Sequence, residues 1–212
     1  MDIVNFLFRW AHLLFGITWI GMLYYFNFVQ TEYFKEADPT ALPDAKAKLA
    51  PRALWWFRWG AMFTFVTGVI LLGGVQHLSL MNDFIVLGAL LGTFMFLNVW
   101  LIIWPNQKIV LGLAEGDAKA AAPKAGLASR TNTLFSAPMA FCMLASPHLG
   151  YSADYLVSAN GGGLGLIAAV LLTVLLQANA MFGKMGPIAS IRGVIHMSLA
   201  LTAVFFLLLL FL

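Results

Sequence analysis

The apolar positions of this chain fall into long blocks, not into the short alternating patterns that are typical of strands. A helix that crosses the hydrocarbon core of a bilayer needs about 20 mainly apolar residues. Proline, glycine and charged residues divide the chain into six segments of this kind. The segments cover residues 3–29, 53–75, 83–104, 131–146, 162–182 and 191–212. The pattern predicts an all-α fold, a polytopic bundle of about six transmembrane helices that forms a single domain over residues 1–212.

The polar stretches between these segments add detail to that prediction. Segment 131–146 is the shortest, and we expect its helix to extend backward through Lys124 and Arg130 into an aqueous loop. The stretch 31–52 mixes acidic and basic residues with three prolines, which favours a solvated connector with short helical turns.

Basic residues are confined to alternate loops and so predict an orientation. They follow the first, third and fifth segments as Lys35, Lys46, Lys48 and Arg52, then Lys108, Lys119, Lys124 and Arg130, and finally Lys184 with Arg192. Lysine and arginine are enriched in cytoplasmic loops of membrane proteins. We therefore expect both termini to face away from the cytoplasm.

Composition supports a membrane location and limits the chemistry. With 61% hydrophobic and 10% charged residues and a mean hydropathy of +0.87, the chain does not read as a water-soluble globule. The lipid bilayer is the expected surrounding. The net charge of +3 is spread over several loops, which argues against nucleic-acid binding. Cys142 is the only cysteine, which excludes an intramolecular disulfide, an iron–sulfur cluster and a covalent c-type haem.

The predicted spans contain ionisable residues, among them Arg9, His12, Arg58 and His196, which are candidates for function because charge in hydrocarbon is costly. Arg9 and His12 lie about 9 and 13 Å below the outer end of the first segment, and Arg58 lies about 8 Å from the inner end of the second. The two arginines either extend to the headgroups or pair with an anionic group between helices, such as a haem propionate or a quinone head. Arg9 and His12 share a helix face at their i, i+3 spacing.

For His12 two interpretations stay open. It is either a neutral imidazole hydrogen-bonded to a neighbouring helix or an axial ligand of haem b, with Gly16 one turn below leaving space for the macrocycle. Met139 is nearly level with His12 and is a candidate second ligand, although methionines in such proteins mostly fill gaps between helices. His148 lies near the outer membrane edge, more than about 10 Å too shallow for this role.

Several motifs together resemble the urate oxidase N-terminal-domain family, the membrane module of the cytochrome c-linked urate hydroxylases. The resemblance covers residues 5 to about 150, and its most specific part is Pro-Asn-Gln-Lys at residues 105–108. The motifs are RWAHLLFGITWIG at residues 9–21, WFRW at 56–59, Asn98-Val99, WPNQK at 104–108, Ser129-Arg130, Asn132-Thr133, Pro138, Met143 and Ser146-Pro147-His148.

The resemblance implies an inner-membrane redox module that passes electrons to a fused or separate c-type cytochrome. Carried over to this sequence, the motif positions are His12, Arg58, Asn106, Gln107, Lys108, Arg130, Asn132 and His148. Two family histidines are replaced, by Trp55 and Thr131, and we expect the family's cytochrome c domain to be absent because the chain has no C-x-x-C-H.

The sequence therefore leaves two candidate functions open. The first is a membrane oxidoreductase module, urate hydroxylase-like, that binds haem b through His12 and relays electrons to a quinone or a c-type cytochrome. The second is a non-catalytic accessory subunit of a larger respiratory or photosynthetic complex. Whether the chain is an enzyme is left open by the sequence.

Overall fold

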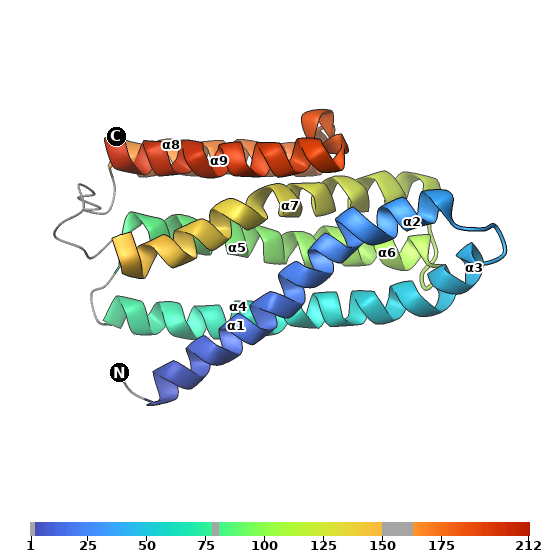
Figure 1. The fold of residues 1–212 in the computed structure, drawn as a ribbon, viewed down its shortest axis with the longest axis horizontal. Coiled ribbons are helices and arrows are strands. Elements are labelled where there is room, and N and C mark those ends of the chain that lie inside the picture. The colour runs from blue at the N-terminus through green and yellow to red at the C-terminus, as the bar shows by residue number, and fades with distance from the viewer. Residues whose placement is uncertain (1–2, 78–80, 150–162) are drawn as a thin grey trace. The chain divides into compact units, whose positions relative to one another are not determined.

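The part of the protein that the structure describes is mostly helical. The structure is a computed structural model that describes residues 3–77, 81–149 and 163–212. Helices account for all its regular elements in these ranges, and no strand occurs there (Figure 1). The all-α prediction is confirmed. Residues 78–80 and 150–162, where we expect loops and the start of the fifth segment, lie outside the described residues.

The helices follow the predicted segments, and those of the first four segments run past the predicted ends. In chain order they are α1 (Ile3–Tyr24), η1 (Tyr25–Gln30), α2 (Thr31–Glu36), α3 (Leu42–Asp44), η2 (Ala45–Leu49), α4 (Ala50–His77), α5 (Asp83–Leu97), η3 (Asn98–Ile103), α6 (Trp104–Val110), α7 (Ala118–Leu149), α8 (Leu164–Phe182), η4 (Gly186–Ala189) and α9 (Ile191–Phe211). The short helices α2 and α3 confirm the helical turns expected in the connector. Because η1, η2 and η3 are π-helical, side chains along them follow a wider turn than in an α-helix.

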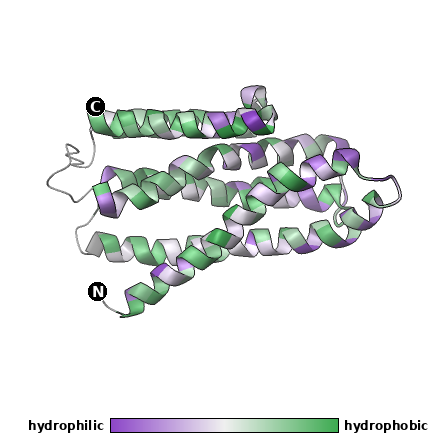
Figure 2. Cartoon of the chain, viewed as in Figure 1, coloured by the Kyte–Doolittle hydropathy of each residue, from purple (hydrophilic) through white to green (hydrophobic). Residues whose placement is uncertain are grey.

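Five helical stretches among the described residues are long and apolar enough to cross a bilayer. They are Ile3–Glu36, Leu42–Val75, Asp83–Val110, Leu164–Phe182 and Ile191–Phe211. Figure 2 shows hydrophobic residues along all of them. The protein is thus a multi-pass membrane protein.

The predicted fourth span corresponds to α7, which is not among these five stretches. As expected, α7 extends backward through Lys124 and Arg130 and is 32 residues long. Its middle buries small and polar side chains such as Ala128, Thr131 and Ser136, which explains its weak apolar signal. The count of six spans and the orientation stay predictions.

The described helices divide into two compact units, and a single domain likewise stays a prediction. Unit 1 comprises residues 1–71 and 96–130. In it, α1 and α4 pack closely: a Cβ atom added at Gly60 would lie 3.1 Å from the backbone nitrogen of Trp19. Aromatic contacts complete this core, including the stacked Phe65 and Phe96 rings, whose centroids are 4.1 Å apart.

Unit 2 comprises residues 72–95 and 131–212. Helices α8 and α9 run side by side and antiparallel (Figure 1). Proline lacks an N–H, so Pro138 cannot donate to the carbonyl of Leu134 four residues earlier. In the structure the hydroxyl of Ser198 on α9 donates to this carbonyl at 2.8 Å, so α9 supplies the bond that α7 lacks.

Candidate functional site

His12 is held against α4 by a hydrogen bond and by a glycine. Its Nδ1 lies 3.0 Å from the hydroxyl oxygen of Thr67. That hydroxyl lies 2.6 Å from the carbonyl oxygen of Phe63 and 3.0 Å from that of Thr64. A carbonyl oxygen only accepts, so the single hydroxyl proton of Thr67 goes to a carbonyl and the hydroxyl oxygen accepts from His12. We therefore assign the imidazole proton to Nδ1, a tautomer in which Nε2 is the ring's acceptor nitrogen.

Gly68 makes room for this ring. A Cβ atom at Gly68 would lie 3.0 Å from Cε1 and 3.5 Å from Nδ1 of His12. The histidine thus occupies the interface between α1 and α4, as the first interpretation of His12 predicts. Arg9, one turn earlier, is exposed and donates through Nε to the side-chain oxygen of Asn5 at 2.8 Å.

The donor chemistry of His12 suits a haem ligand, but the expected space beside it is filled. A free Nε2 lone pair is what an axial histidine presents to iron. At Gly16, however, a Cβ atom would meet the methyl group of Thr64 at 4.0 Å, so this glycine faces α4 and not a slot for a macrocycle. The Thr64 side chain therefore lies where the slot beside Gly16 was expected, and haem binding by His12 stays a prediction.

The candidate second ligands of a haem bound by His12 belong to unit 2. Met139 and His148 lie on α7 in unit 2, so their pairing with His12 stays a prediction. No group of three or more His, Cys, Asp and Glu side chains placed to hold a metal ion occurs in the described ranges.

Arg58 and Lys108 converge on one tryptophan in unit 1, and we call these three residues the Trp104 cluster. The guanidinium carbon of Arg58 lies 3.8 Å from the ring centroid of Trp104, and Nζ of Lys108 lies 5.7 Å from it. Both distances are within the range of cation–π attraction. Two motif residues beside them have local roles: the Asn106 amide donates to the carbonyl of Ile102 at 2.7 Å, and the Gln107 carbonyl accepts the backbone N–H of Leu111 at 2.9 Å.

Arg130 is the most deeply buried cation among the described residues of unit 1. Its side chain belongs to a residue that is only 6% exposed, and its Nη1 has no hydrogen-bond partner in the described part of the chain. Gln30 on η1 likewise has a buried side-chain oxygen without a partner there. An unpaired donor and an unpaired acceptor, both shielded from water, are costly unless a ligand or water satisfies them.

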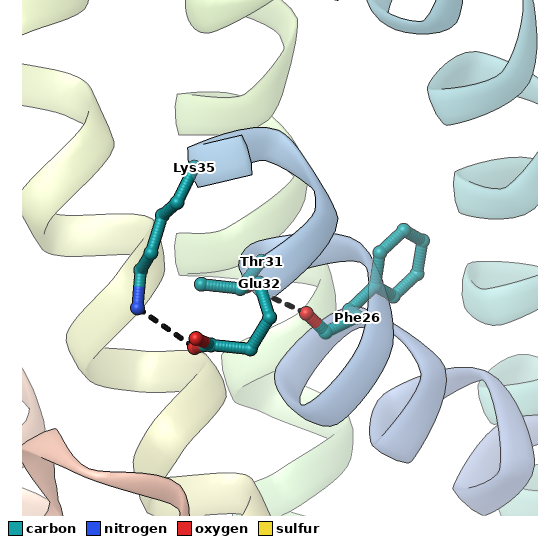
Figure 3. A network of polar contacts seen from close by, with 4 residues as sticks. All are labelled: Phe26, Thr31, Glu32 and Lys35. Atoms are coloured by element: carbon teal, nitrogen blue, oxygen red, sulfur yellow. Dashed lines mark hydrogen bonds and ion pairs between the residues drawn. The ribbon is translucent and has the colours of Figure 1, made fainter. Parts of the chain in front are cut away.

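A hydrogen bond ties the helices that carry these two groups. The amide nitrogen of Asn27, one turn before Gln30, donates to the hydroxyl of Ser129 at 2.8 Å. We call Asn27, Gln30, Ser129 and Arg130 the Arg130 site. Glu32 lies close enough to attract Arg130 electrostatically, but its carboxylate is bound to Lys35 at 2.7 Å (Figure 3).

Sequence reasoning found only part of this site. Arg130 was a motif position, whereas Asn27 and Gln30 were missed. The sequence feature that could have indicated them is a pair of side-chain amides at i, i+3 spacing, which lies at the inner end of the first segment. Asn132, another motif position, instead donates to the carbonyl of Met95 in unit 2 at 2.9 Å and links α7 to α5.

Comparison with known families supports the resemblance to the urate oxidase N-terminal family, but over a different range of residues from the one that the motifs covered. A family model described as urate oxidase N-terminal matches residues 73–182, more than half of the chain. The match includes Lys108, Arg130 and Asn132, but begins after Arg9, His12 and Arg58. Comparison with curated proteins and with solved structures finds no match.

Proposed function

The chain belongs to the urate oxidase N-terminal family, and from this premise we propose that it is a membrane redox module whose Arg130 site binds urate or a similar anionic purine. The observation that carries the proposal is the buried Nη1 of Arg130, which has no partner among the described residues. A guanidinium in a dry site binds an anionic oxygen strongly through charge-assisted hydrogen bonds.

The unpaired side-chain oxygen of Gln30 limits which ligands suit the Arg130 site. The Gln30 side-chain oxygen needs a donor, so a ligand that carries both an anionic oxygen and N–H groups satisfies both residues. An anionic purine has this combination. Asn27 and Ser129 hold the two helices together, which keeps the donor and the acceptor in place.

The chemistry requires an electron acceptor. When a substrate gains one oxygen atom from water, it releases two protons and two electrons. A quinone takes up both protons and both electrons, and two molecules of a c-type cytochrome take up one electron each while the protons go to solvent. We place the module in the bacterial inner membrane, where both acceptors occur. A haem b, if bound, would supply one-electron transfer, and His12 would be its ligand.

Urate binding by the purified protein tests the proposal. We expect equilibrium dialysis in mild detergent to show urate binding that Arg130→Gln weakens by at least about tenfold, since a hydrogen bond to a charged group is worth about 1.5–3 kcal/mol. Lys124→Gln is the matched control, because Lys124 is exposed on the same helix and the charge change is equal. Equal binding by the Arg130→Gln protein and the parent protein would refute the site.

An absorption spectrum tests the haem component separately. We expect a Soret band in protein from haem-replete cells and its loss or shift in His12→Ala. Absence of both the band and urate binding would favour the accessory-subunit alternative. A pull-down in mild detergent that enriches respiratory subunits would then support that alternative.

A further inference from the structure

We propose that the Trp104 cluster binds the phosphate of an anionic phospholipid headgroup. The site does not depend on the proposed function. The guanidinium carbon of Arg58 lies 3.8 Å from the Trp104 ring centroid, and a cation–π contact does not use up the N–H donors of the guanidinium. Neither Arg58 nor Lys108 has an ion-pair or hydrogen-bond partner for its side chain among the described residues; the two ion pairs found there use Lys35 and Lys48.

The two cations contact the same aromatic ring. Since both distances are measured to the Trp104 centroid, the charged centres lie within about 10 Å of each other. Arg58 comes from α4 and Lys108 from α6, so a phosphate group between them would bridge two helices of unit 1. Arginine suits this ligand because its planar fork matches two phosphate oxygens.

Nearby tryptophans indicate that the Trp104 cluster lies at the depth of the lipid headgroups. Trp55 and Trp56 are 45% and 58% exposed on α4, and Trp59 contacts the Trp100 ring edge-on at 5.7 Å. Tryptophan is enriched at the membrane–water interface. At that level the abundant anion is the lipid phosphate, and basic pockets between membrane helices are known to take anionic headgroups. Depth and the lack of a carboxylate partner together favour a lipid as the ligand.

Native mass spectrometry of the delipidated full chain tests this proposal. We expect added phosphatidylglycerol to bind more tightly than phosphatidylcholine. Arg58→Gln and Lys108→Gln should each weaken phosphatidylglycerol binding about fivefold, as expected for one cation at a membrane surface. Arg58→Lys keeps the charge but loses the planar fork, so its loss should be smaller than that of Arg58→Gln.

Arg52 provides a control position for the lipid-binding experiment. Arg52→Gln removes one exposed charge from the first turns of the same helix, outside the cluster, and should leave binding unchanged. An equal loss in Arg52→Gln, or no preference between the two lipids, overturns the proposal. Displacement of the lipid by millimolar inorganic phosphate also overturns it, in favour of a free-anion site. If Arg58→Gln does not fold, as judged by circular dichroism, Lys108→Gln alone decides.

Discussion

At the scale of single residues, His12 shows how a costly side chain is accommodated within a membrane-spanning helix. Its Nδ1 lies 3.0 Å from the hydroxyl oxygen of Thr67, and Gly68 leaves room for the ring, because a Cβ atom there would lie 3.0 Å from Cε1 of His12. A neutral, hydrogen-bonded imidazole costs far less in hydrocarbon than a charged one. Position 12 is thus compatible with the membrane before any cofactor is considered.

Gly68→Ala should destabilise the protein by about 1–3 kcal/mol, as overpacking typically does. The new methyl group would lie 3.0 Å from Cε1 of His12, so the ring must move and its bond to Thr67 must lengthen. The thermal midpoint, followed by circular dichroism in detergent, should fall. Gly73→Ala is the matched control: the same helix gains the same methyl group with nothing within 4 Å, and alanine favours helix by up to about 1 kcal/mol.

A double variant isolates the cause of this effect. In a His12→Ala background the atoms that Gly68→Ala would approach are gone, so the second substitution should then be neutral or stabilising. A loss of stability of the same size in both backgrounds would show that the contact with His12 is not the reason.

At the scale of helices, the spans followed from the sequence, whereas their irregularities did not. Apolar length predicted the spans near residues 3–29, 83–104 and 191–212. The sequence predicted that the third helix extends past its span, but it did not predict that the first continues to Glu36 or that η1 and η3 are π-helical. Hydropathy averages over turns, and the hydrogen-bond pattern that distinguishes a π-helix depends on tertiary contacts. For the same reason the Arg130 site was only half predicted, since nothing local to Ser129 indicates that Asn27 lies 2.8 Å away.

Ser198 and Pro138 should be energetically coupled across α7 and α9. Ser198→Ala removes the hydroxyl that donates to the Leu134 carbonyl at 2.8 Å and leaves a buried acceptor unpaired. We expect a loss of about 0.6–2 kcal/mol, the range for hydrogen bonds between membrane helices. In a Pro138→Ala background the restored N–H donates to Leu134, so Ser198→Ala should cost less. Thermal midpoints of the four proteins give the coupling, and strictly additive effects would contradict it.

At the scale of the whole molecule, the status of α7 decides the topology. Five stretches are apolar enough to cross a membrane, and an odd number of crossings places the termini on opposite sides. If α7 also crosses, the count is six and both termini face the same side, as the distribution of lysine and arginine predicts. The polar residues of α7 do not argue against crossing, because Thr131, Asn132 and Ser136 are at most 2% exposed and so do not face lipid.

Labelling with a membrane-impermeant maleimide should settle the number of crossings. Single cysteines at Glu36 and Lys119 test the two predicted cytoplasmic loops, and one at Leu212 tests the C-terminus; all three positions are exposed. Cys142 is 1% exposed and should stay unlabelled in the parent protein. With six crossings, intact spheroplasts should be labelled at position 212 alone, and positions 36 and 119 only after permeabilisation. If α7 does not cross, positions 36, 119 and 212 cannot follow this pattern, because residue 212 would then lie on the cytoplasmic side with residue 119.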